Sequence, residues 1–172
     1  MLYNIHVKQI KRGEIMPDLL VKLYDLEKLN ISLKLPEEIA IKRPIGPEKK
    51  TIVEWVEKNF GKLWASECDV SFSNKPISSF IAYEKRTKEI VGFACYDTTA
   101  RGFFGPTGVL EKYRGKGIGK ALLVYCLKDM LNVGYAYAII GDAGPVEYYK
   151  KTVGAEVIKD STPGIYKDLL QE

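Results

Sequence analysis

The sequence predicts an α/β fold, or α+β under stricter sorting, with a mixed, mostly antiparallel twisted sheet that has helices on both faces. Three observations predict it: apolar runs of strand length are mixed with helical periodicities, two of the runs resemble a hairpin, and a glycine-rich turn joins a strand to the clearest helix. The 172 residues, 46% hydrophobic and 28% charged, suit one globular unit, so we expect a single domain over residues 1–172.

The first third of the chain predicts one strand and two helices. Residues 1–10 alternate apolar and polar side chains, which is typical of a strand. Leucines at helical spacing predict a helix over 18–29, and a second apolar stripe predicts a helix over 51–60. The polar, proline-bearing stretch 30–50 between them predicts a loop or a partly ordered flap.

The middle of the chain predicts the sheet. Apolar runs at 79–84 and 90–96 flank a charged turn and predict an antiparallel hairpin. Residues 103–110 predict the next strand, which contains Gly105 and Pro106. Because proline cannot donate a main-chain hydrogen bond, we expect this strand to bulge or to separate from a neighbour.

The last third predicts a strongly amphipathic helix and three shorter elements. A continuous apolar stripe predicts the helix over 115–131. Shorter apolar patterns predict a strand over 135–140, a helix over 146–151 and a strand over 155–158.

Composition excludes several classes of function. The net charge of +4 is spread along the chain, which does not favour nucleic-acid binding. The three cysteines form no CxxC pair and there is one histidine, so we expect reduced thiols and no metal site. No apolar run approaches the roughly 20 residues of a membrane span, and no signal peptide is evident, so we expect no membrane association and a cytoplasmic location.

Residues 114–120 carry the most informative pattern, because they lead from a strand into the clearest helix. Glycines at 115, 117 and 119 let main-chain N–H groups gather and let a ligand approach. The positive end of the helix dipole, with Lys116 and Lys120, favours a phosphate or diphosphate. The alternative is a basic surface turn that only begins a helix.

Two common phosphate motifs do not fit this loop. A Walker loop needs Ser or Thr after Gly-Lys, whereas Ala121 follows Lys120. A dinucleotide fingerprint needs GxGxxG within an early βαβ unit, and the spacing here is GxGxG.

Arg114, Gly117 and Gly119 match a third motif. This motif consists of Gln or Arg, any two residues, Gly, any one residue, and Gly or Ala. With it the sequence resembles the GCN5-related N-acetyltransferase (GNAT) family. The resemblance covers about 81–158, through the preceding strand, the following helix and the Tyr148-Tyr149 pair. Residues 1–76 match only by the order of their elements, and we expect them to determine acceptor specificity.

The resemblance implies an N-acetyltransferase that passes an acetyl group from acetyl-CoA to a primary amine by direct attack. It implies a sheet splayed at the acyl-CoA site. Coenzyme binding then falls to Val109, Leu110, Arg114, Gly115, Lys116, Gly117, Ile118, Gly119 and Lys120. A main-chain N–H near Leu110 is expected to face the developing oxyanion. Tyr149 matches the tyrosine that protonates the departing sulfur, and packing is its alternative role.

The resemblance leaves the general base and the acceptor open. Asp97, Glu111 and Asp142 are the candidate bases or substrate contacts, by their position in the motif. The acceptor is an amine of a small molecule or a peptide, and a homodimer stays open. A non-catalytic acyl-CoA sensor and an enzyme that uses ATP or NAD are the alternative functions.

Two further expectations concern packing. The scattered aromatics Trp55, Phe60, Trp64 and Phe72 could line an acceptor cleft, but their helical spacing favours the core. An aspartate in place of Gly117 is expected to abolish coenzyme binding while the fold stays largely intact.

Overall fold

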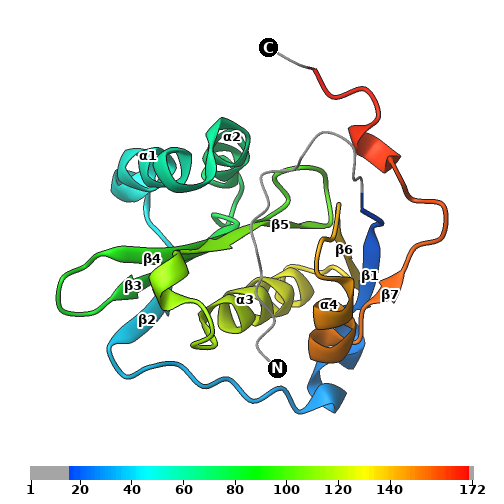
Figure 1. Ribbon diagram of the computed structural model, residues 1–172, viewed down its shortest axis with the longest axis horizontal. Coiled ribbons are helices and arrows are strands. Elements are labelled where there is room, and N and C mark those ends of the chain that lie inside the picture. The colour runs from blue at the N-terminus through cyan, green and yellow to red at the C-terminus, as the bar shows by residue number, and fades with distance from the viewer. Residues whose placement is uncertain (1–15, 171–172) are drawn as a thin grey trace.

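The computed structural model describes residues 16–170 of the chain (Figure 1). The strands are β1 Leu19–Lys22, β2 Ile39–Lys42, β3 Ser79–Glu84, β4 Ile90–Tyr96, β5 Phe103–Val109, β6 Tyr137–Ile140 and β7 Glu156–Val157. The α-helices are α1 Lys49–Phe60, α2 Lys62–Ser71, α3 Ile118–Asn132 and α4 Val146–Val153. Short 3-10 helices occur at Leu23–Leu29, Gly46–Glu48, Glu111–Tyr113 and Gly164–Tyr166.

The described strands form one seven-stranded sheet in the order β2-β3-β4-β5-β6-β1-β7. All neighbouring pairs are antiparallel except β5 and β6, which run parallel. The fold is therefore mixed and mostly antiparallel, as the sequence predicts.

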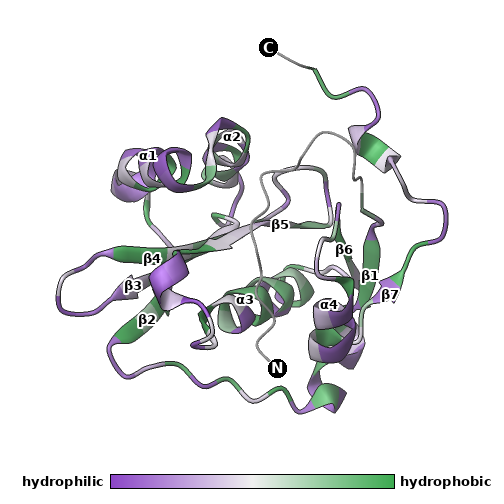
Figure 2. Cartoon of the chain, in the orientation of Figure 1, coloured by the Kyte–Doolittle hydropathy of each residue, from purple (hydrophilic) through white to green (hydrophobic). Residues whose placement is uncertain are grey.

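Helices cover both faces of the sheet, and each face has its own core (Figure 1). The larger core contains most of the apolar stripe of α3, including Leu122, Leu127 and Met130, which are fully buried. The smaller core joins α1 and α2 to β3 and β4 through residues such as Val56 and Phe93. Figure 2 shows α3 as the most continuously hydrophobic helix, consistent with its place against the middle of the sheet.

The middle strand β5 bulges and then leaves its neighbour. Ala94 of β4 pairs with Thr107, but Tyr96 pairs with Phe104, so Gly105 and Pro106 face a single residue of β4. On its other side β5 pairs with β6 only through Phe103 and Phe104. Both outcomes that the sequence predicts for this strand occur. From Gly105 onward no strand of the described residues pairs with this edge of β5, which we call its open edge.

The predicted helix over 18–29 is wrong. Its first part is β1, in which Leu19 and Val21 are fully buried, and the rest is the 3-10 helix Leu23–Leu29. The leucine spacing is compatible with a helix or with a strand. Residues 19–22 form a strand because they pair with both β6 and β7. The order of elements in the first third changes accordingly.

Two elements were not predicted from the sequence. β2 lies within the stretch 30–50, for which the sequence predicts a loop or a partly ordered flap, and it pairs with β3. Helix α2 follows α1 across the single residue Gly61, which has a φ of 95°. The predicted strand over residues 1–10 falls outside the described residues.

The predicted hairpin β3–β4 is confirmed, and the later elements differ only at their ends. Helix α3 begins at Ile118 because Gly115 and Gly117 have left-handed backbone conformations that a helix cannot contain. The strand expected over 135–140 begins at Tyr137, α4 continues to Val153, and the last strand is limited to Glu156–Val157.

Within residues 16–170, no helix is long and apolar enough to cross a bilayer. The described residues also contain no group of three or more side chains placed to hold a metal ion. The cytoplasmic location and the homodimer stay predictions.

Candidate functional site

The loop before α3 presents main-chain donors toward solvent. Gly117 caps the helix with a φ of 82°, and Gly115 has a φ of 76°. The amide of Ala121 is the first in the helix to find an intrahelical acceptor, the carbonyl of Gly117 at 3.0 Å. Among the described residues, none of the amides of residues 115–120 donates to another group. Together with the helix dipole, these donors suit an anion.

Cationic side chains surround the loop. The Nζ atoms of Lys112 and Lys116 lie 5.0 Å and 5.2 Å from the centroid of the Tyr113 ring, so this ring attracts two cations. Lys120 lies in the first turn of α3 and is partly exposed. The Nε atom of Arg114 donates to the carbonyl of Val109 at 3.1 Å and so ties the loop to the end of β5.

The segment 30–38 passes against this loop. A Cβ added to Gly117 would lie 2.5 Å from the main-chain oxygen of Lys34. Such a contact is impossible without a shift of the backbone, and the left-handed φ adds strain for any other residue. The expectation that an aspartate here leaves the fold largely intact is therefore wrong.

The open edge of β5 leads from the loop into the sheet. The amide of Leu110 donates to the carbonyl of Val91 at 2.9 Å, so this amide is not available to a ligand. Main-chain groups alternate in direction along a strand, so those of Val109 and Thr107 point away from β4 toward the open edge. Among the main-chain N–H groups near Leu110, the one that points to the open edge is that of Val109.

Tyr149 lies on α4, on the same face of the sheet as α3. Its side chain is 8% exposed and belongs to the core cluster against which Val109 also packs. Burial raises the pKa of its phenol well above the usual value, so the hydroxyl stays protonated over a wide pH range. The ring of Tyr148 meets it edge-on at 5.2 Å.

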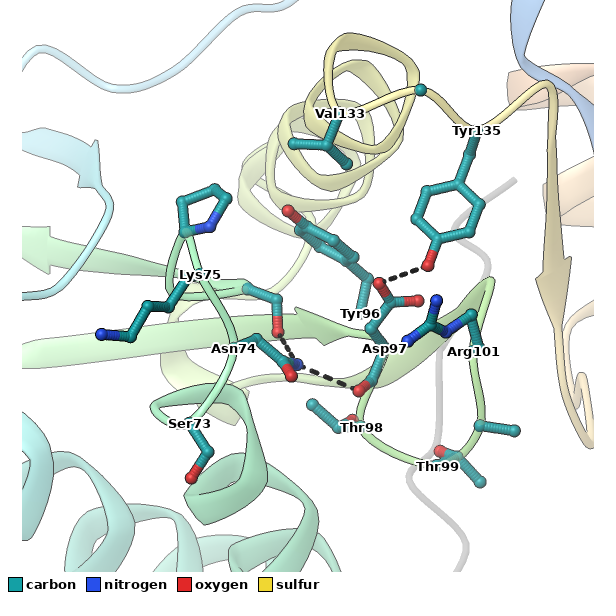
Figure 3. Close-up of a pocket in the computed structure, with 14 residues that line it drawn as sticks. Ser73, Asn74, Lys75, Tyr96, Asp97, Thr98, Thr99, Arg101, Val133 and Tyr135 are labelled. Carbon is teal, nitrogen blue, oxygen red and sulfur yellow. Dashed lines mark hydrogen bonds between the residues drawn. The ribbon is translucent and has the colours of Figure 1, made fainter.

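Asp97 lies at the opposite end of α3 from the glycine loop. It lines a hollow of about 820 Å³ formed by the turns after α2, β4 and α3 (Figure 3). Its Oδ1 accepts from the amide of Gly102 at 2.6 Å and its Oδ2 from the hydroxyl of Tyr135 at 2.7 Å. Burial and this carboxylate raise the pKa of Tyr135 to about 12. Asp97 therefore stabilises a turn, and no residue of the glycine loop lines this hollow.

The other two candidate carboxylates lie in different surroundings. Asp142 follows β6, and its Oδ1 accepts from the amide of Met16 at 2.8 Å while its own amide donates to Asp18. Glu111 is exposed beside the glycine loop. The structure does not bring Asp97, Glu111 and Asp142 together.

Sequence reasoning missed a partly buried carboxylate, Glu67, because it missed α2. The hydroxyl of Thr99, in the turn between β4 and β5, donates to its Oε1. Burial raises the pKa of Glu67 although this hydrogen bond opposes the shift. The spacing of Trp64, Cys68 and Ser71, which face the sheet, was the available signal for the helix.

The expectation that the scattered aromatics pack into the core is confirmed. Trp55, Phe60, Trp64 and Phe72 all pack against the smaller core between α1, α2 and the sheet. Phe60 stacks on Trp64 at 5.6 Å and covers Gly108, where a Cβ would lie 2.6 Å from its ring. These rings lie on the side of the sheet opposite α3, and Phe60 covers β5 there.

The residues at the start of α3 fit a diphosphate followed by an extended arm. The loop supplies amides and cations, and the open edge of β5 next to it supplies main-chain groups for an extended ligand. This arrangement by itself does not distinguish coenzyme A from ATP or NAD, because all three carry a diphosphate.

Comparison with known proteins identifies a family. The sequence model of the acetyltransferase (GNAT) family matches residues 49–155, which include α1, the glycine loop and α4. No curated protein matches the chain.

Solved structures share the fold at low identity. A GCN5-related N-acetyltransferase from Sphaerobacter thermophilus is 20% identical with a TM-score of 0.64, over 83% of this chain and 48% of that one. A GCN5-related N-acetyltransferase from Kribbella flavida is 19% identical with a TM-score of 0.61, over 84% and 55%. The chain thus spans about half the length of these two.

A smaller relative matches over most of its own length. A GNAT family acetyltransferase from Brucella melitensis, solved in complex with acetyl-CoA, is 19% identical with a TM-score of 0.52. The match covers 72% of this chain and 88% of that one.

Proposed function

Because the chain belongs to the acetyltransferase (GNAT) family, we propose that it is an N-acetyltransferase that uses acetyl-CoA and a primary amine. One observation carries the proposal: the amides of residues 115–120 lack acceptors among the described residues and adjoin the open edge of β5. A diphosphate and a peptide-like arm are the two parts of coenzyme A that such surfaces suit.

The coenzyme residues keep the roles that the sequence indicates, with two changes. Gly115, Lys116, Ile118, Gly119 and Lys120 offer amides and charge to the diphosphate, and Gly117 forms the turn. The Nε atom of Arg114 ties the loop to Val109 of β5, and the Leu110 amide bonds to Val91 of β4, so neither of these two donors is assigned to the coenzyme.

When bound, acetyl-CoA supplies a thioester whose carbonyl carbon the amine attacks. The Val109 amide, which points to the open edge, donates to the carbonyl oxygen as negative charge develops there. The Tyr149 hydroxyl donates its proton to the sulfur as the carbon–sulfur bond breaks. Its raised pKa keeps it protonated until that step, and burial limits competition from water.

We assign the choice of acceptor to residues 1–76. Within the described part of this region, α1 and α2 cover the face of β5 that lies opposite α3 (Figure 1). Phe60 covers Gly108 there, with Trp55 and Trp64 beside it. An amine that arrives from this face approaches the open edge without crossing the diphosphate loop.

The test is a pair of variants at Gly119. A Cβ at this position would lie 3.7 Å from the Val109 side chain, an ordinary contact, so Ala fits the fold without strain. Gly119→Ala should retain coenzyme A binding in calorimetry, whereas Gly119→Asp should abolish it through repulsion between like charges. Thermal unfolding of both variants is the control for folding.

Two further measurements separate this function from the alternatives. Coenzyme A, but not ATP or NAD, should displace bound acetyl-CoA. Thiol release with a panel of amines should exceed the background for at least one of them. Tight coenzyme binding without release would favour a sensor, and equal binding by both Gly119 variants would refute the site.

A further inference from the structure

Glu67 is a partly buried carboxylate that has no counter-ion within residues 16–170. It lies on α2 and is partly buried, and no Lys or Arg among the described residues forms an ion pair with it. Its hydrogen-bond donor in the described part of the chain is the Thr99 hydroxyl, which reaches Oε1 and leaves Oε2 without a partner there. A carboxylate held by a single neutral donor retains capacity to accept a proton.

The surroundings of Glu67 lie at the inner end of the gap between β5 and β6. Thr98, next to Thr99, donates from its hydroxyl to the carbonyl of Gly105 at 2.9 Å, and Gly105 is where β5 leaves β6. The Tyr166 hydroxyl lies 2.5 Å from the position of a Cβ on Gly141, the residue that follows β6.

Tyr166 lies near both Glu67 and the residue Gly141 that follows β6. Its phenol has a pKa raised first by burial and then by the charge of Glu67, while Thr99 acts on that pKa in the opposite direction. Glu67, Thr99 and Tyr166 therefore form one group, close to where β5 and β6 separate. Tyr149 belongs to the core on the other face.

The other titratable groups near Glu67 are acidic or neutral. Asp18, just before β1, and Asp142, just after β6, add negative charge near Tyr166. The thiol of Cys95 on β4 is fully buried. Burial raises the pKa of this thiol, the charge of Glu67 raises it further, and the thiol therefore stays neutral. These surroundings suit a cation, and none of these groups would hold Glu67 in its ionised form.

We propose that the Glu67 carboxylate is the general base, which accepts a proton from the acceptor ammonium at the α2 side of the gap between β5 and β6. The inference rests on the proposed function and names a base for it. Asp97 is less suited because both of its carboxylate oxygens already accept hydrogen bonds, from the Gly102 amide and the Tyr135 hydroxyl. The burial that raises the pKa of Glu67 also makes it a stronger base than an exposed carboxylate.

The proton balance is complete. The ammonium gives one proton to Glu67, directly or through one water, and becomes a neutral amine. A carbon–nitrogen bond forms at the thioester carbonyl, the carbon–sulfur bond breaks, and Tyr149 protonates the sulfur. The second proton lost by nitrogen replaces that of Tyr149 through solvent, and Glu67 releases its own to solvent. The products are an amide, a free thiol and one proton.

The test compares Glu67→Gln with Asp69→Asn. Glutamine keeps an oxygen for the Thr99 hydrogen bond but cannot take a proton, and Asp69 is an exposed carboxylate on the same helix. With the best amine of the panel, Glu67→Gln should lower kcat about 100-fold or more near neutral pH. Its remaining activity should rise with pH as the acceptor ammonium loses a proton to solvent and becomes the free amine. Asp69→Asn should resemble the unaltered chain.

Two measurements do not depend on turnover. Acetyl-CoA affinity by calorimetry should be the same in both variants, because Glu67 lies away from the diphosphate loop. Carbon-13 NMR of the coenzyme-free protein should show a carboxyl signal, absent from Glu67→Gln, that titrates above the ordinary range for glutamate.

The outcomes distinguish the two proposals. Full activity with an unchanged pH profile in Glu67→Gln, while the unaltered chain turns over, would overturn Glu67 alone. A parallel loss of acetyl-CoA affinity would also overturn it, since the residue would then be structural. An unaltered chain that neither binds coenzyme A nor releases thiol would overturn the proposed function, and this inference with it.

Discussion

The main-chain oxygen of Lys34 lies 2.5 Å from where Gly117 would place a Cβ, so the segment 30–38 packs directly on the cap of α3. We predict that Gly117→Ala is destabilising beyond the cost of its left-handed backbone, which is roughly 1–2 kcal/mol for a residue with a Cβ. The clash should add a further loss, measured as a lower Tm in thermal unfolding.

Gly115→Ala is the matched control for this prediction. Gly115 has a similar φ of 76° and nothing within 4 Å of its added Cβ, so it bears the backbone cost alone. Equal Tm values for the two variants would show that Lys34 does not press on the loop.

Two lysines should contribute to coenzyme affinity through charge. We predict that Lys116→Gln and Lys120→Gln each weaken coenzyme A binding about 3- to 10-fold, less at high salt, because a charge-assisted contact to phosphate is lost. Lys128→Gln is the control, since Lys128 is exposed in the second half of the same helix. Titration calorimetry at two salt concentrations measures the difference, which should be absent for the control.

The Tyr149 hydroxyl should affect turnover rather than coenzyme binding. We predict that Tyr149→Phe lowers kcat about 100-fold and leaves coenzyme affinity unchanged, because a proton donor acts only as the sulfur departs. The phenol pKa is raised by burial, so its acid form persists above pH 10 and activity should not fall through the ordinary tyrosine range. Tyr148→Phe, at the neighbouring ring, should retain turnover, and equal rates for both variants would assign Tyr149 to packing.

A charged network joins the segment before α1 to α3. Asp129 accepts from Arg43 at 2.6 Å and from the hydroxyl of Tyr96 at 2.6 Å, and Tyr96 is 2% exposed. We predict that Asp129→Ala costs about 2 kcal/mol or more in the free energy of unfolding, because a buried hydroxyl and a guanidinium lose their acceptor. Denaturant unfolding measures this.

The exposed pair of Lys49 and Asp69 is the control for the network. Its side chains are 42% and 49% exposed, so Asp69→Ala should cost about 1 kcal/mol or less. A double-mutant cycle of Asp129→Ala with Tyr96→Phe should give a coupling energy, and strict additivity of the two changes would argue against the network.

The sequence predicts those elements whose signal is local. The stripe of α3, the hairpin β3–β4 and the break at Gly105 and Pro106 each depend on spacing or backbone chemistry within one segment. The glycine loop belongs to the same class, because positive φ values and an exposed helix start are properties of the local chain.

The failures occur where distant partners choose between local alternatives. Leucines at 19, 20, 23, 26 and 29 fit a helix by spacing, but β1 is a strand because β6 and β7 lie on either side of it. β2 is short and partly polar, and β3 provides the ladder that makes it a strand. Helix α2 has no strong start signal, and its position depends on packing against β4 and β5.

By itself, the sequence determined the nature of the donor site, because a run of glycines before an amphipathic helix exposes main-chain amides whatever lies around it. Only the tertiary structure decided which carboxylates are buried and what surrounds them. The sequence pattern indicates Asp97, Glu111 and Asp142, whereas the fold places Glu67 of α2 against Thr99, in the turn between β4 and β5. The pKa of a carboxylate depends on burial and neighbours, which chain order does not encode.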